Sequence, residues 1–498
     1  MKLLVFHGYL LRGTGSNIYN ASLCRALVRL GHEVHLLCQD RGLAGEWQGV
    51  HVHVPDIGGV LPVYVADRYE GFEAVPFPEL DDERLARYLE ANVVAVRELA
   101  RAVGPDLALA NHLIMGPAIL ARGLEGRVPY AVKVHGSALE YTVRPHPERF
   151  LPYAREGLAG AAGVLVGSRH TAESLWEVMG DPQLPRKTRH GPPGVDVDAF
   201  RPRPPDEAAA ALDALARRLA AGRAASWGGA EDAAEALRFL DPRRDRIVSF
   251  VGKLIVAKGV DLLLAAWPLV VAAIPEARLC LVGFGTYRAG LERMLAALAR
   301  GDLADLREIA ARGRELEGGP PGELRYLAAF LEGAGEAYAA LGRAGAERVH
   351  LTGRLEHNDL PALLSACEAQ VVPSTFPESF GMVAAEAAAC GVLPLSAAHS
   401  GLAEVIATLA PVVAPELRPL LSFAPGPGAV QEIARKLVAW LRLEPARRGG
   451  AAASLARAAR ARYGWESVAE GVLAAARGRL GELPEPGYPA RPSAKVSG

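Results

Sequence analysis

The sequence predicts an α/β protein built from two doubly wound domains, and three observations lead to this prediction. The chain has 498 residues, which is too long for one hydrophobic core and fits two domains with insertions. Short apolar runs alternate with helical patterns in two separate series, and this alternation predicts parallel sheets covered by helices. Between the two series, residues 192–198 have the proline and glycine density of a linker.

The first series begins with a strand, a loop and a helix. An apolar strand is expected at residues 3–6, followed by a loop at 8–16. A helix is expected from about residue 17 to residue 30, and Gly31 ends it because glycine tolerates the backbone of a helix stop. The next apolar run, at 33–38, predicts a second strand.

Further strand–helix units follow in both series. In the first, strands are expected at 107–111, 130–135 and 163–166, and Ser168 is placed to cap the helix after the last of them. In the second series, strands are expected at 247–251, 279–282, 349–351, 369–372 and 393–396, with helices between them.

Two stretches exceed what a minimal doubly wound domain needs. Residues 205–241 and about 288–346 are rich in Ala, Arg and Glu with helical periodicity, and we interpret both as helical insertions. They belong to a second domain placed at 198–445, which follows a first domain at 1–197. The tail at 481–498 is expected to be disordered, because prolines recur in it.

Composition limits the classes of partner and compartment. The formal net charge of −1 argues against nucleic acid, which needs a basic face. Residues 1–197 hold 20 Lys and Arg against 22 Asp and Glu, which weakens a lipid acceptor without excluding it. The apolar stretches are too short or interrupted to span a bilayer, and we expect the N-terminus to form a first strand instead of a signal peptide. Five cysteines without CxxC spacing fit the reduced thiols of a cytoplasmic protein.

The most informative feature is a pair of acids, Glu378 and Glu386, at the start of an expected buried helix. Ser379 can cap the first turn, Gly391 can end the helix, and the alanines between them favour helix formation. An expected strand leads directly into this segment. A strand, a short loop and a helix start with a carboxylate are the geometry of a phosphate-ligand site at the carboxyl end of a parallel sheet.

The placement of lysine indicates the cationic half of such a site. The chain has seven Lys and 48 Arg, and two of the seven, Lys253 and Lys258, lie five residues apart in a glycine-flanked loop after an expected strand. Compact ammonium groups beside such a loop suit a diphosphate, because each brings a charge that can follow the leaving group. The alternative is a loop with two solvated lysines.

The first domain offers two weaker candidates. A loop with Gly13, Gly15 and Ser16 opens the first helix, and its backbone amides can approach a phosphate or an acceptor anion. His135 ends an expected strand, as does His7, at the edge where ligands bind in such sheets. A lone histidine is more often a core or capping residue, so these positions depend on further support.

Together these motifs resemble the retaining nucleotide-sugar glycosyltransferases of family 4, which have the GT-B fold. Glu378 and Glu386 match the family's E-x7-E motif, and the segment from Lys253 to Lys258 is similar to its G-R/K-L…K-G motif. Lys253 stands where the family often has arginine. The resemblance covers most of the chain outside the two insertions and the tail.

The resemblance implies an architecture. The two doubly wound domains would be Rossmann-like and would face a central cleft. A C-terminal helix at 446–480 would return to the first domain, as is usual in the family.

The resemblance also implies roles for the matching residues. Lys253 and Lys258 would stabilise charge on the departing diphosphate, while Glu378 would position the sugar. Glu386 would hold the ribose, and His135 would touch the transferred sugar. The other residues expected to bind the nucleotide sugar are Gly15, Ser16, Arg354, Phe380, Gly381, Met382 and Val383.

The implied activity is transfer of a hexose or N-acetylhexosamine from a UDP or GDP sugar to an alcohol, with retention of anomeric configuration. In the family the leaving phosphate takes the acceptor proton, so no protein nucleophile is needed. No His, Asp or Glu cluster has metal-ligand spacing, so we expect neither a catalytic metal nor a cofactor beyond the nucleotide-sugar co-substrate. The acceptor would be a small molecule, a glycan or a glycolipid, the last with transient contact to a membrane surface.

Three alternatives remain open at this stage. A non-hydrolysing nucleotide-sugar epimerase uses the same two-domain architecture, and it would turn over donor without any acceptor. A non-catalytic binding protein could carry large insertions on the same scaffold, although the four charged residues of the motifs are intact. Finally, residues 13–19 resemble the entry loop of transferases that act on inositol phosphate, which would make the acceptor specific.

Overall fold

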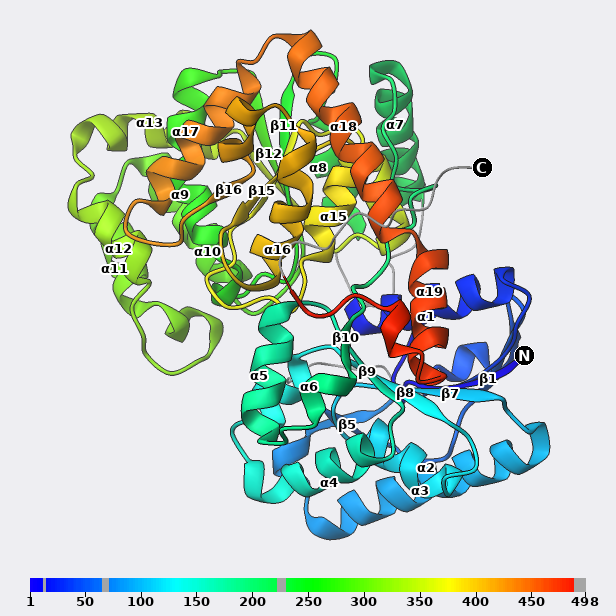
Figure 1. Cartoon of the computed structure of the whole chain (residues 1–498). Coiled ribbons are helices and arrows are strands. Elements are labelled where there is room, and N and C mark those ends of the chain that lie inside the picture. The colour runs from blue at the N-terminus through cyan, green and yellow to red at the C-terminus, as the bar shows by residue number, and fades with distance from the viewer. Residues whose placement is uncertain (12–14, 65–70, 222–229, 488–498) are drawn as a thin grey trace. The chain divides into compact units, whose positions relative to one another are not determined.

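The computed structural model describes residues 1–11, 15–64, 71–221 and 230–487. The chain folds into two compact units, which are coloured by residue number in Figure 1. Unit 1 comprises Met1–Gly194 and Tyr463–Gly498, and unit 2 comprises Val195–Arg462. Each unit has its own large, mainly parallel sheet, which confirms the predicted α/β class with two doubly wound halves.

Unit 1 is organised around β1 (Lys2–Phe6), the central strand of an eight-stranded sheet with the order β10-β9-β8-β7-β1-β2-β4-β3. All pairs are parallel except β3 with β4. The order reverses between β1 and β7, and ligands bind at such a switch point, beyond the carboxyl ends of the strands. The other strands of unit 1 are β2 (Glu33–Leu37), β3 (Gly45–Trp47), β4 (Val50–His53), β7 (Leu107–Asn111), β8 (Tyr130–Val134), β9 (Gly163–Val166), β10 (Thr188–His190) and the separate parallel pair β5 (Val60–Val63) and β6 (Glu73–Pro76).

Helices cover both faces of this sheet, as Figure 1 shows. One apolar core includes residues of α2, α3, α4 and α5, and the other includes residues of α1 and α19. Ser168 accepts a hydrogen bond from the amide of Thr171 at 3.1 Å, so it caps α5 as predicted. The helices of unit 1 are α1 (Gly15–Arg29), α2 (Asp82–Val103), α3 (Gly116–Leu124), α4 (Pro147–Ala159), α5 (Arg169–Met179), α6 (Leu184–Lys187) and α19 (Trp465–Ala476).

The C-terminal helix α19 belongs to unit 1 because its apolar face completes the second core. Trp465 is 4% exposed, and a Cβ added at Gly194 would lie 2.5 Å from its ring. Of the expected disordered tail, the part up to residue 487 is described, and the carbonyl of Pro484 accepts a hydrogen bond from the amide of His190 at 2.8 Å. Residues 488–498 lie outside the described residues.

Unit 2 is organised around β11 (Arg246–Val251), which starts a six-stranded parallel sheet with the order β13-β12-β11-β14-β15-β16. In chain order this is 3-2-1-4-5-6, the order of a doubly wound nucleotide-binding sheet, with its switch point between β11 and β14. The other strands are β12 (Ala277–Val282), β13 (Val349–Gly353), β14 (Ala369–Val372), β15 (Leu393–Ala397) and β16 (Ser422–Phe423). The five strands predicted in this half are therefore confirmed.

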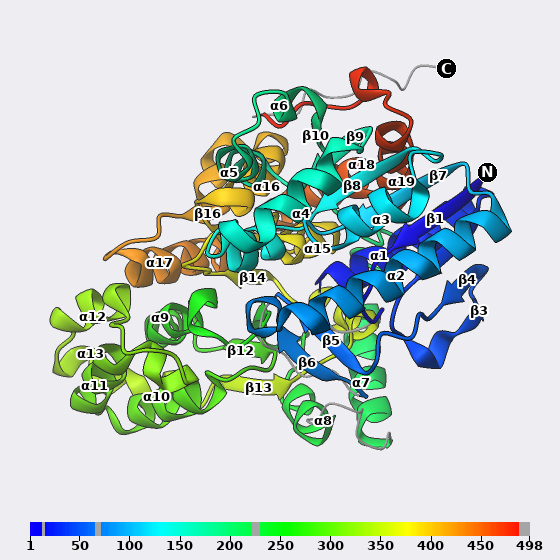
Figure 2. The same cartoon turned by 90° about the horizontal axis from the view of Figure 1, so that it is seen from below.

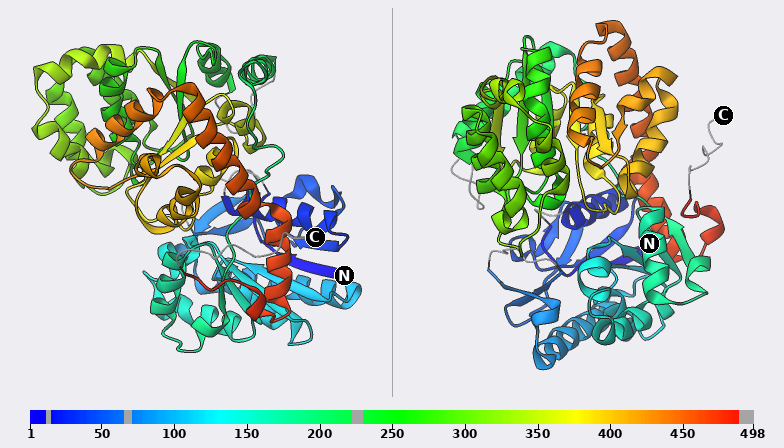
Figure 3. Two further views of the ribbon diagram at one scale, coloured as in Figure 1. Left: turned by 45° about the horizontal axis from the view of Figure 1, so that its top comes forward. Right: turned by 90° about the vertical axis from the view of Figure 1, so that its left-hand side faces the viewer.

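Both predicted insertions contain helices where they are described. The second packs on α9: Tyr338 donates a hydrogen bond to the carbonyl of Ala265 at 2.8 Å, and a Cβ at Gly345 would lie 2.8 Å from Pro268. Figures 2 and 3 show α10 to α13 grouped together at one end of this unit. The helices of unit 2 are α7 (Pro205–Ala221), α8 (Ala230–Arg238), α9 (Val260–Ala273), α10 (Arg288–Arg300), α11 (Leu303–Arg312), α12 (Arg325–Glu332), α13 (Glu336–Ala346), α14 (Leu360–Leu364), α15 (Met382–Ala389), α16 (Ser400–Leu409), α17 (Ala429–Leu441) and α18 (Pro445–Tyr463), the last of which runs into unit 1. Within the first insertion, residues 222–229 lie outside the described residues.

Two further expectations concern the surroundings of the chain. Among the described helices, none combines the length and the apolar character that crossing a bilayer requires. All five cysteines are free thiols and all are buried.

Candidate functional site

In unit 2, the loops after β11 and β14 meet at the switch point of the sheet. The amide of Thr375 donates to the carbonyl of Ala257 at 2.9 Å, which joins the two loops through their backbones. Gly259 has φ +64°, and a Cβ there would lie 2.1 Å from the carbonyl oxygen of Pro373. Only glycine allows this approach, because any side chain would collide with the neighbouring backbone. The motif glycine therefore holds the lysine loop against the glutamate loop.

Lys258 and Glu378, the two charged residues of these loops, form an ion pair. The Lys258 Nζ donates to Glu378 Oε1, and the hydroxyl of Ser374 donates to the same oxygen at 2.6 Å. Burial acts to raise the pKa of Glu378, but the attraction and hydrogen bond of Lys258, together with Ser374, outweigh it and lower the pKa below its ordinary value. Glu378 is therefore an ionised hydrogen-bond acceptor at neutral pH.

The backbone of Glu378 is fixed by the start of α16. Its amide donates to Ser400 Oγ at 2.8 Å, and its carbonyl accepts from the amide of Gly401 at 2.9 Å. His399 Nε2 lies 2.7 Å from the carbonyl of Ser374, and its Nδ1 lies 3.0 Å from Ser400 Oγ. Because Nε2 must donate to that carbonyl, a neutral His399 accepts from the Ser400 hydroxyl, which in turn accepts from Glu378. The sequence analysis assigned no role to His399 or Ser400, which come three and four residues after the end of a predicted strand.

The start of the acidic helix differs from the prediction. The helix α15 begins at Met382, with Gly381 as its N-terminal cap at φ +114°, so Ser379 does not cap it. A side chain at Gly401 would meet the backbone of Phe380 at 2.6 Å, and this close contact fixes the segment before the helix. Glu378 therefore lies in the loop before α15, whereas the backbone amides near Val383 belong to the first turn of the helix.

Glu386, the second acid of the motif, is placed differently from Glu378. It is 1% exposed, and its Oε1 accepts a hydrogen bond from His357 Nε2 at 2.8 Å. His357 comes from the segment after β13, so this contact ties α15 to the segment that follows the edge strand of the sheet. Arg354, from the same segment, pairs with Glu356 at 3.0 Å and lies 5.6 Å from the ring of Phe284. The sequence analysis missed His357, because it belongs to no motif that the chain displays.

Lys253 stands at the crossing of the loops after β11 and β12. The amide of Gly252 donates to the carbonyl of Val282 at 3.0 Å, and a Cβ at Gly283 would lie 1.8 Å from the carbonyl of Gly252. Lys253 is half-buried and belongs to the same loop as Lys258. Both motif lysines therefore follow one strand at the switch point.

In unit 1, a chain of neutral polar side chains lies at the carboxyl ends of β1, β7 and β8. His135 Nε2 is 2.8 Å from Asn111 Oδ1, and the Asn111 amide donates to Asn20 Oδ1 at 2.7 Å. The Asn20 amide is 3.0 Å from His7 Nδ1, whose ring continues to Asn17 through Nε2 at 3.0 Å. Burial lowers the pKa of His7 to about 4 and that of His135 well below its ordinary value, so both rings are neutral.

His112 lies beside this chain and was missed by the sequence analysis. It follows β7 with φ +67° and is 3% exposed, and neither ring nitrogen has a hydrogen-bond partner among the described residues. Its ring centre is 4.9 Å from that of His135 and 4.7 Å from that of Tyr64. A left-handed backbone and an unsatisfied buried ring are both costly, and such features concentrate at functional sites.

The predicted first-unit residues are partly described. Gly15 is exposed and Ser16 is half-buried at the start of α1, whose first turn contains no acidic residue. The carbonyl of Ser16 accepts from the Asn20 amide at 2.9 Å, which ties the helix start to the polar chain. The predicted Gly13 lies outside the described residues.

Comparison with known protein families locates two domains. Residues 14–189 match the model of the glycosyl transferase 4-like domain, and residues 336–448 match that of the glycosyl transferases group 1. Together the two matches span more than half of the chain.

Curated relatives match almost the full length. A D-inositol 3-phosphate glycosyltransferase of Xylanimonas cellulosilytica is 28% identical over 469 residues, covering 92% of this chain and 90% of the relative. One of Frankia alni is 26% identical over 476 residues, covering 94% and 95%.

Solved structures share the fold at lower identity. Sucrose-phosphate synthase from Thermosynechococcus elongatus has a TM-score of 0.60 and 21% identity, covering 97% of this chain and 99% of that one. The catalytic domain of starch synthase IV from Arabidopsis thaliana, bound to ADP and acarbose, has a TM-score of 0.59 and 14% identity, covering 96% and 99%.

Proposed function

Because this chain is a GT-B glycosyltransferase, with a glycosyl transferase 4-like domain followed by a group 1 domain, we propose that it moves a hexosyl or N-acetylhexosaminyl group from a nucleoside diphosphate sugar to an alcohol. The anomeric configuration is retained. UDP and GDP are the candidate nucleotides of the donor.

One observation supports the donor site above all others, namely the Lys258–Glu378 pair at the switch point of the second sheet. An ammonium carries three N–H groups, and Glu378 engages one of them. Lys258 with Lys253 and the first-turn amides of α15 would attract the diphosphate. The ionised Glu378 carboxylate would accept hydrogen bonds from sugar hydroxyls beside it.

The remaining motif residues fit the nucleoside side of the donor. Glu386 is proposed to hold the ribose, with its carboxylate oriented by the 2.8 Å contact to His357. Arg354 follows β13, the edge strand of the sheet, where the base is expected to lie against backbone and side chain. Sugar and ribose would thus bind on two sides of the start of α15.

The proposed reaction needs no protein nucleophile. The bond between the anomeric carbon and the phosphate oxygen breaks as the acceptor oxygen approaches on the same face and forms the new bond. The acceptor proton passes to an oxygen of the leaving phosphate, so charge builds on the diphosphate. Lys253 and Lys258 would stabilise that charge in the transition state.

The acceptor is proposed to be a phosphorylated polyol of the inositol phosphate type. All six curated relatives found carry the name D-inositol 3-phosphate glycosyltransferase, at 26–29% identity. Unit 1 offers amides and neutral imidazoles at its switch point, which suit the hydroxyls of a polyol. The start of α1 at Gly15 carries no acidic residue in its first turn and favours an anion.

The reaction is proposed to take place in the cytoplasm. All five cysteines are buried free thiols, which is the state that a reducing compartment preserves. No catalytic metal or cofactor is proposed beyond the co-substrate.

A transfer assay with a matched acceptor pair tests the proposal. The purified protein is incubated with UDP-, GDP- and ADP-sugars in turn. Each donor is combined either with an inositol phosphate or with unphosphorylated inositol, and the product masses are measured by mass spectrometry. We expect one donor to give a product one sugar heavier, with the phosphorylated acceptor strongly preferred. Equal use of both acceptors would reject the phosphate preference. Conversion of donor to an epimer without acceptor would instead identify an epimerase.

A further inference from the structure

A second polar cluster lies in unit 1, away from the residues assigned to transfer. Glu33 and His35 lie two residues apart on β2, and His51 and His53 lie two residues apart on the neighbouring strand β4. The two strands are parallel, with His35 paired to His51 and Leu37 paired to His53. Because side chains two residues apart share a face, and paired residues of adjacent strands do too, all four side chains lie on one face of the sheet.

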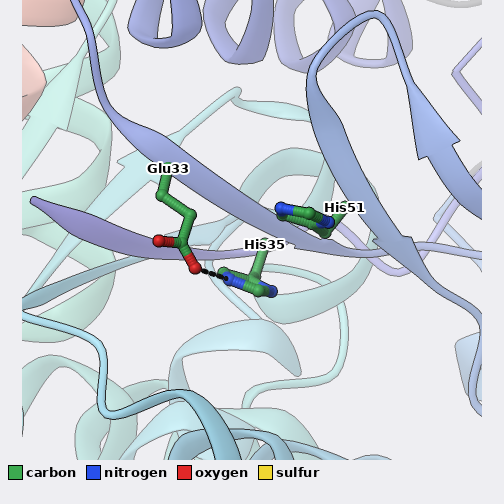
Figure 4. Close-up of side chains that lie close together, drawn as sticks. All are labelled: Glu33, His35 and His51. Atoms are coloured by element: carbon green, nitrogen blue, oxygen red, sulfur yellow. Dashed lines mark hydrogen bonds and ion pairs between the residues drawn. The ribbon is translucent and has the colours of Figure 1, made fainter.

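The four side chains also approach one another closely. His35 Nε2 lies 2.9 Å from Glu33 Oε1, and His35 Nδ1 lies 3.1 Å from His53 Nε2. The rings of His35 and His51 lie close together (Figure 4) and stack, with their centres 4.7 Å apart. Glu33, His35 and His51 each offer one ligand atom, and these atoms all lie within 4.8 Å of one another.

We propose that this cluster binds a divalent transition metal, with zinc as the expected ion. Imidazole nitrogen and carboxylate oxygen are the ligands that zinc takes in proteins, at about 2.0–2.2 Å. A zinc ion with three protein ligands takes a water in the fourth position. Glu33, His35 through Nε2, and His51 are assigned as ligands, and His53 contacts the other ring nitrogen of His35.

The protonation implied by the contacts supports this assignment. Two imidazole nitrogens within hydrogen-bond distance require one of them to accept, so His35 and His53 cannot both present N–H groups at that contact. A bare imidazole nitrogen is the form that ligates a metal. With zinc on Nε2, the Nδ1 of His35 would donate to His53 Nε2, so His53 would orient the ligating ring.

The surroundings permit entry of an ion from solvent. Glu33 and His51 are exposed, while His35 is 7% exposed beneath them. One charged group near the cluster is Lys2, whose Nζ lies 4.0 Å from Glu33 Oε1 and whose side chain is 47% exposed. A solvated lysine at this distance competes weakly, because exposed ion pairs contribute little free energy.

The position of the cluster indicates a structural role instead of a catalytic one. Glu33 is the first residue of β2, whereas the polar chain of unit 1 lies at the carboxyl ends of β1, β7 and β8. A metal here would tie β2 to β4, next to the edge strand β3. The proposal is therefore independent of the transferase function and of the expectation that transfer needs no catalytic metal.

Equilibrium dialysis of the untagged full-length protein against micromolar zinc, with metal analysis, tests the proposal. We expect one zinc ion per chain, and cobalt(II) in its place should give the visible absorption of a tetrahedral site. The variant H51Q/H53Q removes one ligand and the side chain that orients His35, so its zinc affinity should fall more than tenfold. The control H170Q, on α5, removes a histidine outside the cluster and should bind as the wild type does.

Two results would overturn the proposal. The first is unchanged zinc affinity in H51Q/H53Q, which would place the bound zinc outside the cluster, and the second is a wild-type protein that takes up no zinc. A second variant, E33Q, changes only an exposed carboxylate, so it keeps the test valid if the double variant is unstable. Loss of affinity in E33Q with an unchanged melting temperature of the metal-free protein is the expected result.

Discussion

Replacing Lys258 with methionine is expected to slow sugar transfer by about 100-fold. Methionine keeps most of the length of the side chain but removes the charge. Losing one preorganised charge at the developing diphosphate costs on the order of 3 kcal/mol in the barrier, which corresponds to about two powers of ten in kcat. Because the lysine lies in a loop at a half-buried position, its removal should leave the core of unit 2 intact.

The same substitution should change the pH dependence of transfer. In the wild type, burial raises the pKa of Glu378, yet Lys258 and Ser374 bring it below its ordinary value of 4.5. Without Lys258, the two largest opposing effects disappear, so the Glu378 pKa rises. The acidic limb of kcat/KM should therefore move to higher pH in K258M, since transfer needs the ionised carboxylate.

The linked effect on stability has a definite sign. Because the pKa of Glu378 is lower in the folded state, the ion pair adds stability above the unfolded pKa, and this contribution is lost as pH falls through the folded pKa. Wild-type stability should thus drop below about pH 4.5, and K258M, which lacks the pair, should drop less. Thermal melts between pH 3 and 7 measure the difference.

The matched control is K436M, which removes a lysine from another ion pair of unit 2. Lys436 Nζ lies 2.6 Å from Glu432 Oε1 on α17, outside the candidate site. K436M should lower the melting temperature but keep the wild-type kcat. Initial rates at saturating donor compare the variants. A kcat for K258M within a factor of two of wild type, or an equal loss in K436M, would refute the assignment of Lys258 to the diphosphate.

Three further expectations follow from particular residues. E386Q should raise the KM for donor more than it lowers kcat, because the ribose binds alike in ground and transition states; an unchanged KM would remove Glu386 from the donor site. G259A should cost several degrees of melting temperature and most activity, since its Cβ would lie 2.1 Å from the carbonyl of Pro373; wild-type melting would contradict the close loop contact. Burial lowers the pKa of Lys133 to about 7, so the unfolded chain binds more protons from pH 7 to about 10 and stability should rise with pH there. In K133M, stability should rise less between pH 7 and about 10. If the melting temperatures of the two proteins changed equally with pH, Lys133 would be charged in the folded wild type.

Much of the fold could be predicted from the sequence, because its strands are short apolar runs with clear stops. The predicted strands at 107–111, 163–166 and 369–372 agree with β7, β9 and β14. The edge hairpin of β3 and β4 was not predicted, since its strands are short and half-polar. Pairing along an edge depends on tertiary contacts that a local pattern does not contain.

The candidate site was predictable where glycine and charge stand together in a motif, as at Lys258 and Glu378. Ser379 was assigned as a helix cap because serine favours that position, but the loop around Glu378 is held by Ser400 instead, and the helix starts later. His112 could not have been identified from sequence, because its significance rests on an unsatisfied buried ring.

The metal cluster was missed for a related reason. A search for ligand spacing along the chain does not detect Glu33 and His35 joining His51, which is 16 residues beyond His35, because their proximity arises from strand pairing. The signal that could have identified these residues is the spacing of Glu and His side chains at every second position of two adjacent strands.

The central claim is that the chain transfers a sugar with retention, and the configuration of the first-formed product tests it most directly. Proton NMR follows the anomeric configuration of the product from the start of the reaction, before it can change slowly in solution. The account predicts a glycoside of the acceptor with the same anomeric configuration as the donor sugar, and its absence when K258M replaces the wild type at equal enzyme and time. A product of opposite configuration, or free sugar and epimerised donor without a glycoside, would contradict the claim.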